Sequence, residues 1–182
     1  MHRLFIAIRP PEPVCDLLLD TMEGLEGARW QDADNLHVTL RFLGEVETAV
    51  AEDLALALGR IRAAPFPLQL AGVGHFEKAR AAGSRPHAVW AQVAPSTPLE
   101  QLRRKVDQAC AAVGLGHDER RFVPHVTLAR LNAGSGPAGP WLAAHALLRA
   151  GPWQVADFAL FESHLTAHGS HYAEVVRYPL AG

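Results

Sequence analysis

The sequence is poor in cysteine, in lysine and in long apolar runs, and each shortage excludes a class of protein. Two cysteines without metal-like spacing do not make a disulfide framework, so both are expected to be reduced. Only two of the 17 basic residues are lysine, and the net charge of −2 excludes a broad basic surface for long duplex nucleic acid. No stretch approaches the roughly 18 apolar residues of a membrane span, and the N-terminal apolar run is too short for a signal peptide. We therefore expect a cytoplasmic protein without a membrane partner.

The length and composition suit an α+β fold. The 182 residues, 49% of them hydrophobic, are enough for one domain or for two small halves packed together. Apolar spacing predicts four helices, over residues 13–24, 46–61, 97–113 and 141–149. Thr97 is the expected N-cap of the third helix, and strands interleave with the helices in each half of the chain. We expect residues 1–182 to form one bilobal domain. Its two pseudo-twofold-related lobes would each carry an antiparallel sheet with helices on the outer face, with a groove between them.

Two copies of one tetrapeptide dominate the sequence. They are His37-Val38-Thr39-Leu40 and His125-Val126-Thr127-Leu128, 88 residues apart. In an extended strand, side chains alternate between faces, and residues two apart lie roughly 6.6 to 7 Å from each other on one face. Each copy therefore predicts a strand that shows an imidazole and a hydroxyl on its open side and packs Val and Leu into a core. A lone His-x-Thr is common by chance, so the repetition carries the prediction.

Two imidazoles and two hydroxyls are a suitable set of groups around a phosphodiester. Histidine titrates near pH 6.5, so one imidazole can be neutral and the other protonated at neutral pH, which supplies a base and an acid without a metal. In-line displacement at phosphorus needs these two groups on opposite sides, as facing strands allow. The hydroxyls of Thr39 and Thr127 would bind the oxygens where charge develops. The residues alone do not say which of His37 and His125 is the acid.

Four segments of the chain, among them both tetrapeptides, carry a resemblance to a known family. They are Arg3 to Ile8, Asn35 to Glu45, Phe122 to Arg130 and Phe158 to Ser163. With these segments the sequence resembles, essentially end to end, the RNA 2',3'-cyclic phosphodiesterase family, also called 2'-5' RNA ligase, of the two-histidine phosphoesterase superfamily. The resemblance implies hydrolysis of an RNA 2',3'-cyclic phosphate end, or of a small cyclic nucleotide, to a 2'-phosphomonoester without metal or cofactor. It also implies that His37 donates a proton to the 3' leaving oxygen and that His125 accepts one from water.

An arginine is implied as a phosphate ligand, and two candidates stay open. The family pattern places the arginine five positions after the second histidine, Arg130, at the phosphate. Strict alternation puts Arg130 on the wrong face, whereas Arg41, four positions after the first histidine, has the right parity. A bulge after Leu128 would turn Arg130 into the groove, and we favour Arg130. Phe42 holds the matching place in the first repeat, where its ring either stacks on a base or belongs to the core.

The other histidines do not predict a metal site. His164, His168 and His171 lie close together in sequence, but no carboxylate-rich motif accompanies them, and positions on a surface hairpin are expected. No partner is evident in the sequence for four more, namely His75, His87, His117 and His145. Residues 77–86 predict a basic loop.

Two alternative functions remain. The chain could join or cleave 2'-5' linkages in RNA, which is the same displacement with an alcohol in place of water. It could also be a nucleotide-binding module with little turnover, although the presence of both histidines counts against this. A metallophosphoesterase is disfavoured because the usual Asp/His clusters are missing. No repeated apolar seam is evident, so a monomer is expected.

Overall fold

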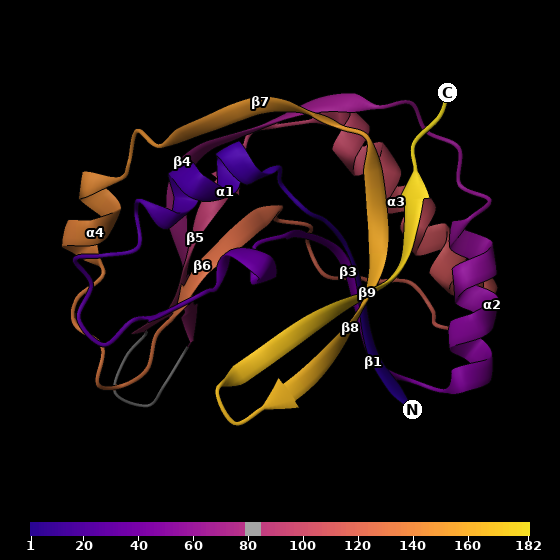
Figure 1. The fold of residues 1–182 in the computed structure, drawn as a ribbon, viewed down its shortest axis with the longest axis horizontal. Helices are drawn as coiled ribbons and strands as arrows, with labels where there is room; N and C mark the ends of the chain where they lie inside the picture. The colour runs from indigo at the N-terminus through magenta and orange to yellow at the C-terminus, as the bar shows by residue number, and fades with distance from the viewer. Residues whose placement is uncertain (79–84) are drawn as a thin grey trace.

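The computed structural model describes residues 1–78 and 85–182, and most of the expected basic loop over residues 77–86 lies outside them. In the described part, the fold is α+β, as the sequence predicts, with nine strands in one sheet and four α-helices (Figure 1). The strands are β1 (His2–Ile8), β2 (Arg29–Trp30), β3 (Val38–Val46), β4 (Phe66–Lys78), β5 (Arg85–Val93), β6 (His125–Arg130), β7 (Arg149–Val155), β8 (Asp157–Thr166) and β9 (Gly169–Pro179). The helices are α1 (Glu12–Leu19), α2 (Thr48–Leu58), α3 (Thr97–Ala112) and α4 (Gly139–Ala144), and a short 3-10 helix spans Ala33–Asn35.

The two tetrapeptide strands meet at the centre of the sheet. The strand order is β7-β4-β5-β6-β3-β1-β8-β9, and β2 pairs with β6 outside this path. Strands β3 and β6 pair at Val38 and Val126, which joins two four-stranded halves into one sheet rather than leaving a separate sheet in each lobe. We call β1, β3, β8 and β9 with α2 and α3 the terminal lobe, and β4 to β7 with α1 and α4 the central lobe.

The two lobes do not correspond to the two halves of the chain. The terminal lobe takes its strands from both ends of the sequence. Helix α1, which follows β1, packs against β7 of the central lobe, whereas α3 packs against α2 and β3 of the terminal lobe. Figure 1 shows α2 and α3 together beside β1, and α1 and α4 on the opposite side of the molecule. The chain crosses between the lobes because each helix covers the apolar face nearest to it in space.

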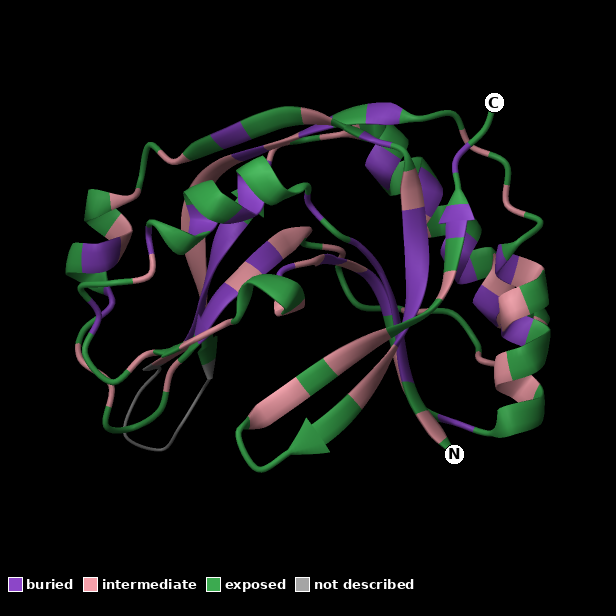
Figure 2. Cartoon of the chain, viewed as in Figure 1, coloured by how far each residue is buried: buried purple, intermediate pink, exposed green. Residues whose placement is uncertain are grey.

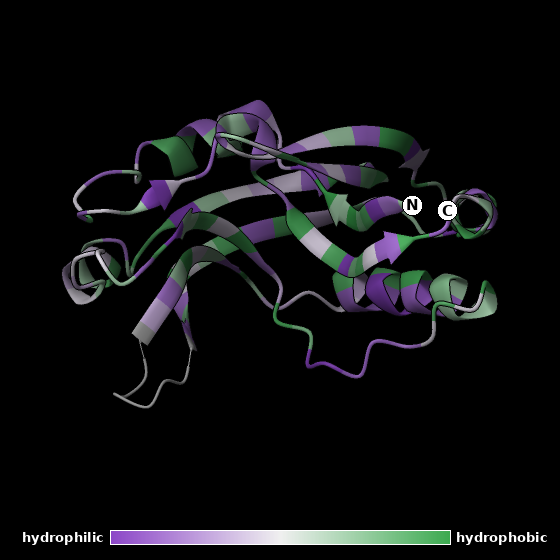
Figure 3. Ribbon diagram, turned by 90° about the horizontal axis from the view of Figure 1, so that it is seen from below, coloured by the Kyte–Doolittle hydropathy of each residue, from purple (hydrophilic) through white to green (hydrophobic). Residues whose placement is uncertain are grey.

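Strand β1 is buried on both faces, which explains its continuous apolar run. Leu4, Ile6 and Ile8 enter the main core, while Phe5 and Ala7 belong to a smaller cluster on the opposite face with Ala159 and Phe161. When both faces of a strand are buried, residues on each face are apolar, so the sequence does not alternate in polarity. Farther from this centre the strands alternate between hydrophobic and hydrophilic residues, as Figure 3 shows. Figure 2 shows that burial fades along the β8–β9 hairpin, which extends beyond the sheet.

The N-cap of helix α3 lies one residue earlier than expected. The N-cap is Ser96, whose Oγ accepts a hydrogen bond from the backbone N–H of Leu99 at 3.3 Å, so Thr97 is the first helical residue. Ser and Thr serve equally as caps, and the sequence could not rank these neighbours. The helix buries one face, which includes Leu102, Val106 and Cys110.

The two cysteines are buried free thiols, as expected. Burial raises the pKa of the Cys110 thiol to about 11. Among the described residues, no helix has both the length and the apolarity needed to cross a bilayer.

Candidate functional site

A cavity of about 360 Å³ lies where the two tetrapeptides meet. Its lining includes the histidine and the threonine of both copies, His37, Thr39, His125 and Thr127. It also includes two other residues named from the sequence, Phe42 and Arg130. The structure therefore brings together the six residues that the sequence analysis placed at the site.

The register of the two strands sets a histidine of one copy opposite a threonine of the other. Val38 pairs with Val126 in antiparallel orientation. When this register is continued by one residue in each direction, His37 falls opposite Thr127 and Thr39 falls opposite His125. The two valines are fully buried, so the alternating positions on either side of them share the open face. The four polar groups thus form a diagonal arrangement with the imidazoles at opposite corners.

Both imidazoles are held in the same way by the backbone. His37 Nδ1 donates to the carbonyl oxygen of Asn35 at 2.6 Å, and His125 Nδ1 donates to the carbonyl oxygen of Val123 at 2.6 Å. Because a carbonyl can only accept, Nδ1 carries the hydrogen in each ring. In the neutral ring, Nε2 is then an acceptor, and it is the atom available to the cavity. The carbonyl two residues before each histidine therefore sets the tautomer and the ring orientation.

Burial and positive charge keep both imidazoles neutral. Burial lowers the pKa of His37 to about 4; the hydrogen bond to Asn35 opposes this shift, and the charges of His125, Arg9 and Arg130 add to it. Burial also lowers the pKa of His125, with a further contribution from Arg130. An anion between the two rings would raise both values, because an opposite charge favours the imidazolium.

Each histidine packs against aromatic rings of its own lobe. The His37 ring lies 4.9 Å from Phe5 and 5.3 Å from Tyr172, measured between ring centroids. The His125 ring lies 4.8 Å from Phe76 and 5.4 Å from Trp90. These rings restrict the motion of the imidazoles and supply the apolar surroundings that lower their pKa values.

A bulge in each tetrapeptide strand decides which arginine reaches the cavity. In β6, Thr127 pairs with Trp90 and Ala129 pairs with the next β5 residue, Val89, so Leu128 is the extra residue. In β3, Thr39 pairs with Ala7 and Arg41 with Ile6, which makes Leu40 the extra residue there. A bulge shifts alternation by one position. Arg130 consequently points into the cavity, as the favoured interpretation required.

Arg41 is turned to the other face by the same kind of bulge. It is 7% exposed and forms an ion pair with Asp107 of α3. Its guanidinium also donates to the carbonyl oxygens of Leu115 and Gly116 at 3.2 Å. Arg41 therefore ties the loop after α3 to the helix face of the sheet and does not line the cavity.

Phe42 lies at the rim of the cavity. It is 42% exposed, and the Arg3 guanidinium lies 5.6 Å from the centroid of its ring. The alternative of a core phenylalanine is therefore wrong. An exposed ring beside a polar cavity is suited to stack on a flat group.

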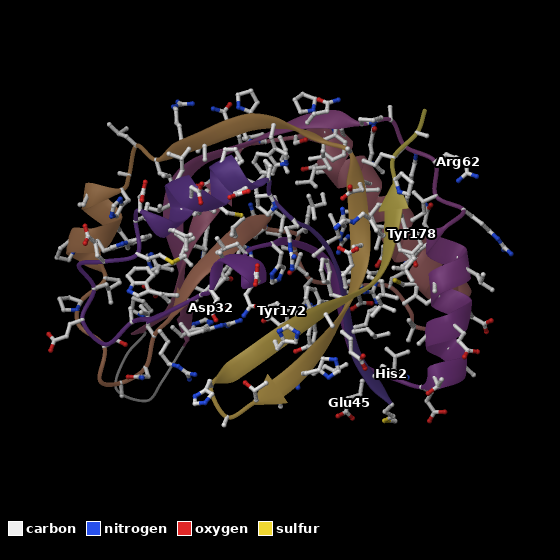
Figure 4. All side chains as sticks on the ribbon, in the orientation of Figure 1. His2, Asp32, Glu45, Arg62, Tyr172 and Tyr178 are labelled. Carbon is white, nitrogen blue, oxygen red and sulfur yellow. The ribbon has the colours of Figure 1, made fainter. Side chains whose placement is uncertain are left out.

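Several residues of the cavity were missed by the sequence analysis. Tyr172 comes from β9, and Gln31 and Asn35 from the segment between β2 and β3. Asn35 Nδ2 donates to the carbonyl oxygen of Ser170 at 2.8 Å, which fixes the β8–β9 hairpin over this end of the cavity (Figure 4 shows Tyr172 on the hairpin). The one signal for Asn35 was its place two residues before His37.

The remaining histidines lie apart from the cavity. His164 and His171 face each other on the β8–β9 hairpin, as expected for surface positions. His75 forms a hydrogen bond with Glu77 at 3.0 Å, and His117 Nδ1 donates to the Asp107 carboxylate at 2.6 Å, so the structure supplies partners that the sequence did not suggest. Within the described part of the chain, no group of three or more His, Cys, Asp or Glu residues could hold a metal ion.

Comparisons with known proteins identify the family of the chain. The model of the 2'-5' RNA ligase superfamily matches residues 10–167. An RNA 2',3'-cyclic phosphodiesterase of Geobacillus stearothermophilus is 31% identical over 165 residues, which are 90% of this chain and 51% of that protein. The chain thus spans about half the length of that relative. The Archaeoglobus fulgidus RNA 2',3'-cyclic phosphodiesterase is 28% identical over 176 residues, 95% of this chain and 97% of the relative.

A solved structure extends the similarity to the whole fold. The crystal structure of E. coli LigT complexed with 3'-AMP aligns with a TM-score of 0.76 and 29% identity, over 100% of this chain and 99% of that one. The family model covers most of the sequence, including both tetrapeptides. The chain belongs to the 2'-5' RNA ligase superfamily.

Proposed function

We propose that this protein hydrolyses 2',3'-cyclic phosphate ends of RNA to 2'-phosphomonoesters by metal-independent acid/base catalysis with two histidines. The observation that carries the proposal is the pair of matched imidazoles. Each is held through Nδ1 by a backbone carbonyl at 2.6 Å, and the two face one cavity from opposite strands. Relatives that bear the name RNA 2',3'-cyclic phosphodiesterase support the same reaction.

In this mechanism the cyclic phosphate lies between the two rings. His125 is the proton acceptor: its Nε2 takes a proton from water as the water attacks phosphorus. His37 is the proton donor: its Nε2 protonates the departing 3' oxygen, and the 2' ester remains. The negative phosphate raises the pKa of the buried His37 imidazole, so substrate binding itself promotes the protonation of the acid. No metal and no cofactor takes part.

The other proposed ligands contact different parts of the substrate. The hydroxyls of Thr39 and Thr127 donate to the non-bridging oxygens, where charge builds up in the transition state. Arg130 supplies a guanidinium to the same phosphate. Phe42 offers its exposed ring to the base of the terminal nucleotide. These roles, the single bilobal domain, the monomeric state and the cytoplasmic location stay predictions.

The decisive experiment uses an RNA oligonucleotide with a 2',3'-cyclic phosphate end in excess EDTA. Wild type is expected to give the 2'-phosphate, identified by chromatography, while His37→Ala and His125→Ala each lose roughly 10² to 10⁴ of the rate. Arg60 is exposed and lies outside both tetrapeptides, so Arg60→Ala serves as a control for the effects of mutagenesis and purification. Tight product binding without turnover in wild type would instead identify a nucleotide-binding module. RNA fragments with 5'-hydroxyl ends in the same assay would reveal 2'-5' joining.

A further inference from the structure

A second cavity of about 390 Å³ adjoins the catalytic cavity. The two share five lining residues, which are Gln31, Asn35, Arg130, Ser170 and Tyr172. Beyond them, the second cavity is lined by β2, by the turn that contains Asp32 and by the tip of the β8–β9 hairpin. Figure 4 shows Asp32 and Tyr172 beside each other at this place. The groove therefore continues past His37 in one direction, and we call this extension the side cavity.

Two arginines stand directly opposite each other in the side cavity. Arg29 of β2 pairs in register with Arg130 of β6, and both line the cavity. Paired residues of antiparallel strands project to the same face, and like charges at such positions repel. Among the described residues, neither guanidinium has an ion pair or a hydrogen bond to a carboxylate. The pairing is stabilised when an anion lies between the two guanidinium groups.

The rest of the lining agrees with an anionic group on a polar ligand. Asp32 is the one carboxylate among the described lining residues, against two arginines and His168. Gln31 and Asn35 add side-chain amides where the side cavity meets the catalytic cavity. Arg130, the proposed ligand of the cyclic phosphate, lines both cavities and so can contact anionic groups in each, whereas Arg29 lines the side cavity but not the catalytic cavity.

The structure of the terminal nucleotide indicates which anionic group of the substrate would lie in the side cavity. In a ribose 2',3'-cyclic phosphate, the base is attached next to the 2' carbon, and the 5' carbon is attached through the position next to the 3' carbon. The two substituents therefore leave the sugar from opposite ends, the base from the 2' side and the 5' carbon from the 3' side. His37, the proposed donor to the 3' oxygen, lies two residues from Asn35, which lines both cavities, whereas Phe42, in the middle of β3, lines the catalytic cavity and not the side cavity. With the base on Phe42, the 5' end of the nucleotide points into the side cavity.

We propose that Arg29, together with Arg130, binds the phosphate on the 5' side of the terminal nucleotide. The inference rests on the proposed function, and it defines the preferred substrate as an oligonucleotide end or a 5'-phosphorylated nucleotide rather than an unphosphorylated nucleoside cyclic phosphate. A phosphate between two guanidinium groups makes charge-assisted hydrogen bonds, which correspond to about tenfold or more in affinity.

The test compares adenosine 2',3'-cyclic phosphate with its 5'-phosphorylated form. The measured quantity is a ratio: kcat/KM for the 5'-phosphorylated substrate divided by kcat/KM for adenosine 2',3'-cyclic phosphate. It is determined for each protein, so that differences in basal activity between variants cancel. Wild type is expected to show a ratio of about ten or more. The ratio should approach one in Arg29→Ala and fall below one in Arg29→Glu. It should also decrease in wild type as salt is added, because the contact is a partly exposed charge pair.

Two controls separate a local contact from other effects. Phe42→Ala changes the lining of the catalytic cavity but not of the side cavity, so it should weaken both substrates alike and keep the wild-type ratio. Arg60→Ala removes one positive charge from an exposed position just after the C-cap of α2 and should also keep that ratio. A wild-type ratio near one, with turnover of both substrates, would overturn the side-cavity proposal and leave the proposed function intact. If wild type turns over neither substrate, the proposed function and this inference are both wrong.

Discussion

The two tetrapeptide repeats hold their histidines alike and then diverge in the residues that follow. Both imidazoles donate Nδ1–H to a carbonyl at 2.6 Å, and both strands bulge at the leucine that ends the tetrapeptide. After the bulge, the first repeat continues with Arg41 and Phe42, and the second with Ala129 and Arg130. The repeated part supplies the matched imidazoles and hydroxyls of the catalytic cavity. The unrepeated part adds the Phe42 ring to this cavity and the Arg130 guanidinium where the two cavities meet.

Their surroundings differ as well. His37 lies under a cluster of Phe5, Phe161 and Tyr172, whereas the His125 ring meets Phe76 and Trp90. The Trp90 indole has room because Gly74 is its cross-strand partner, where a Cβ would come within 2.4 Å of the ring. Two histidines with one hydrogen-bonding pattern thus have unequal environments. The proposed acid and base roles need such an inequality, because chemically identical groups take different roles only in different environments.

The largest expected effect tests which histidine is the acid. A substrate with sulfur in place of the 3' bridging oxygen has a thiolate leaving group, which needs little protonation because thiols titrate near pH 8.5. His37→Ala, slowed roughly 10² to 10⁴ on the normal cyclic phosphate, is expected to regain most of that loss on the sulfur substrate. His125→Ala should stay slow on both. Recovery in His125→Ala alone would reverse the two roles.

The two threonines test the symmetry of the repeats. Thr39→Val and Thr127→Val each remove one donor from the phosphate while nearly keeping the side-chain shape. Each is expected to lower kcat by about 10², the usual loss for one such donor. The comparison is made by steady-state kinetics on one cyclic-phosphate substrate. If one variant is unaffected, the phosphate is held by one repeat only.

Arg130 and Arg41 are expected to differ in role, the first in substrate binding and the second in stability. Arg130→Ala is expected to lower kcat/KM about tenfold or more by removing a phosphate contact, with little change in the urea midpoint. Arg41→Ala leaves the buried Asp107 carboxylate without its arginine and is expected to lower the free energy of unfolding by about 3 kcal/mol. Urea denaturation and kinetics on both variants would check this division. A stable Arg41→Ala protein with strongly reduced activity would place Arg41 at the phosphate after all.

The smallest effect concerns pH. The pKa of both imidazoles lies below the ordinary 6.5, so the free protein loses the protonated acid as pH rises, and kcat/KM should be highest below pH 6.5. Bound phosphate raises both pKa values, which moves the kcat profile to higher pH than the kcat/KM profile. Arg130 lowers the pKa of both rings, so Arg130→Ala should shift the kcat/KM profile toward higher pH. An unchanged profile would show that Arg130 does not act on the histidines electrostatically.

The fold class and the centre of the site could be predicted because they rest on local rules. Period-two alternation places His and Thr on one face of a strand, and repetition makes chance improbable. The four helices follow from apolar spacing, although their ends shift by a few residues; the α3 cap at Ser96 instead of Thr97 is an example. The resemblance in the segments around both tetrapeptides added which histidine is expected to be the acid and which the base, because residue spacing alone could not assign these roles.

By itself, then, the sequence determined the two tetrapeptide strands, the groups on their open faces and the α+β class, since each depends on neighbours along the chain. The tertiary structure decided the rest. Whether Arg41 or Arg130 lines the catalytic cavity depends on bulges that only the pairing with β1 and β5 defines. The crossing of helices between lobes depends on which apolar faces meet. The pairing of Arg29 with Arg130, 101 positions apart, depends on strand β2 adding to the edge of β6, and no local pattern records such a contact.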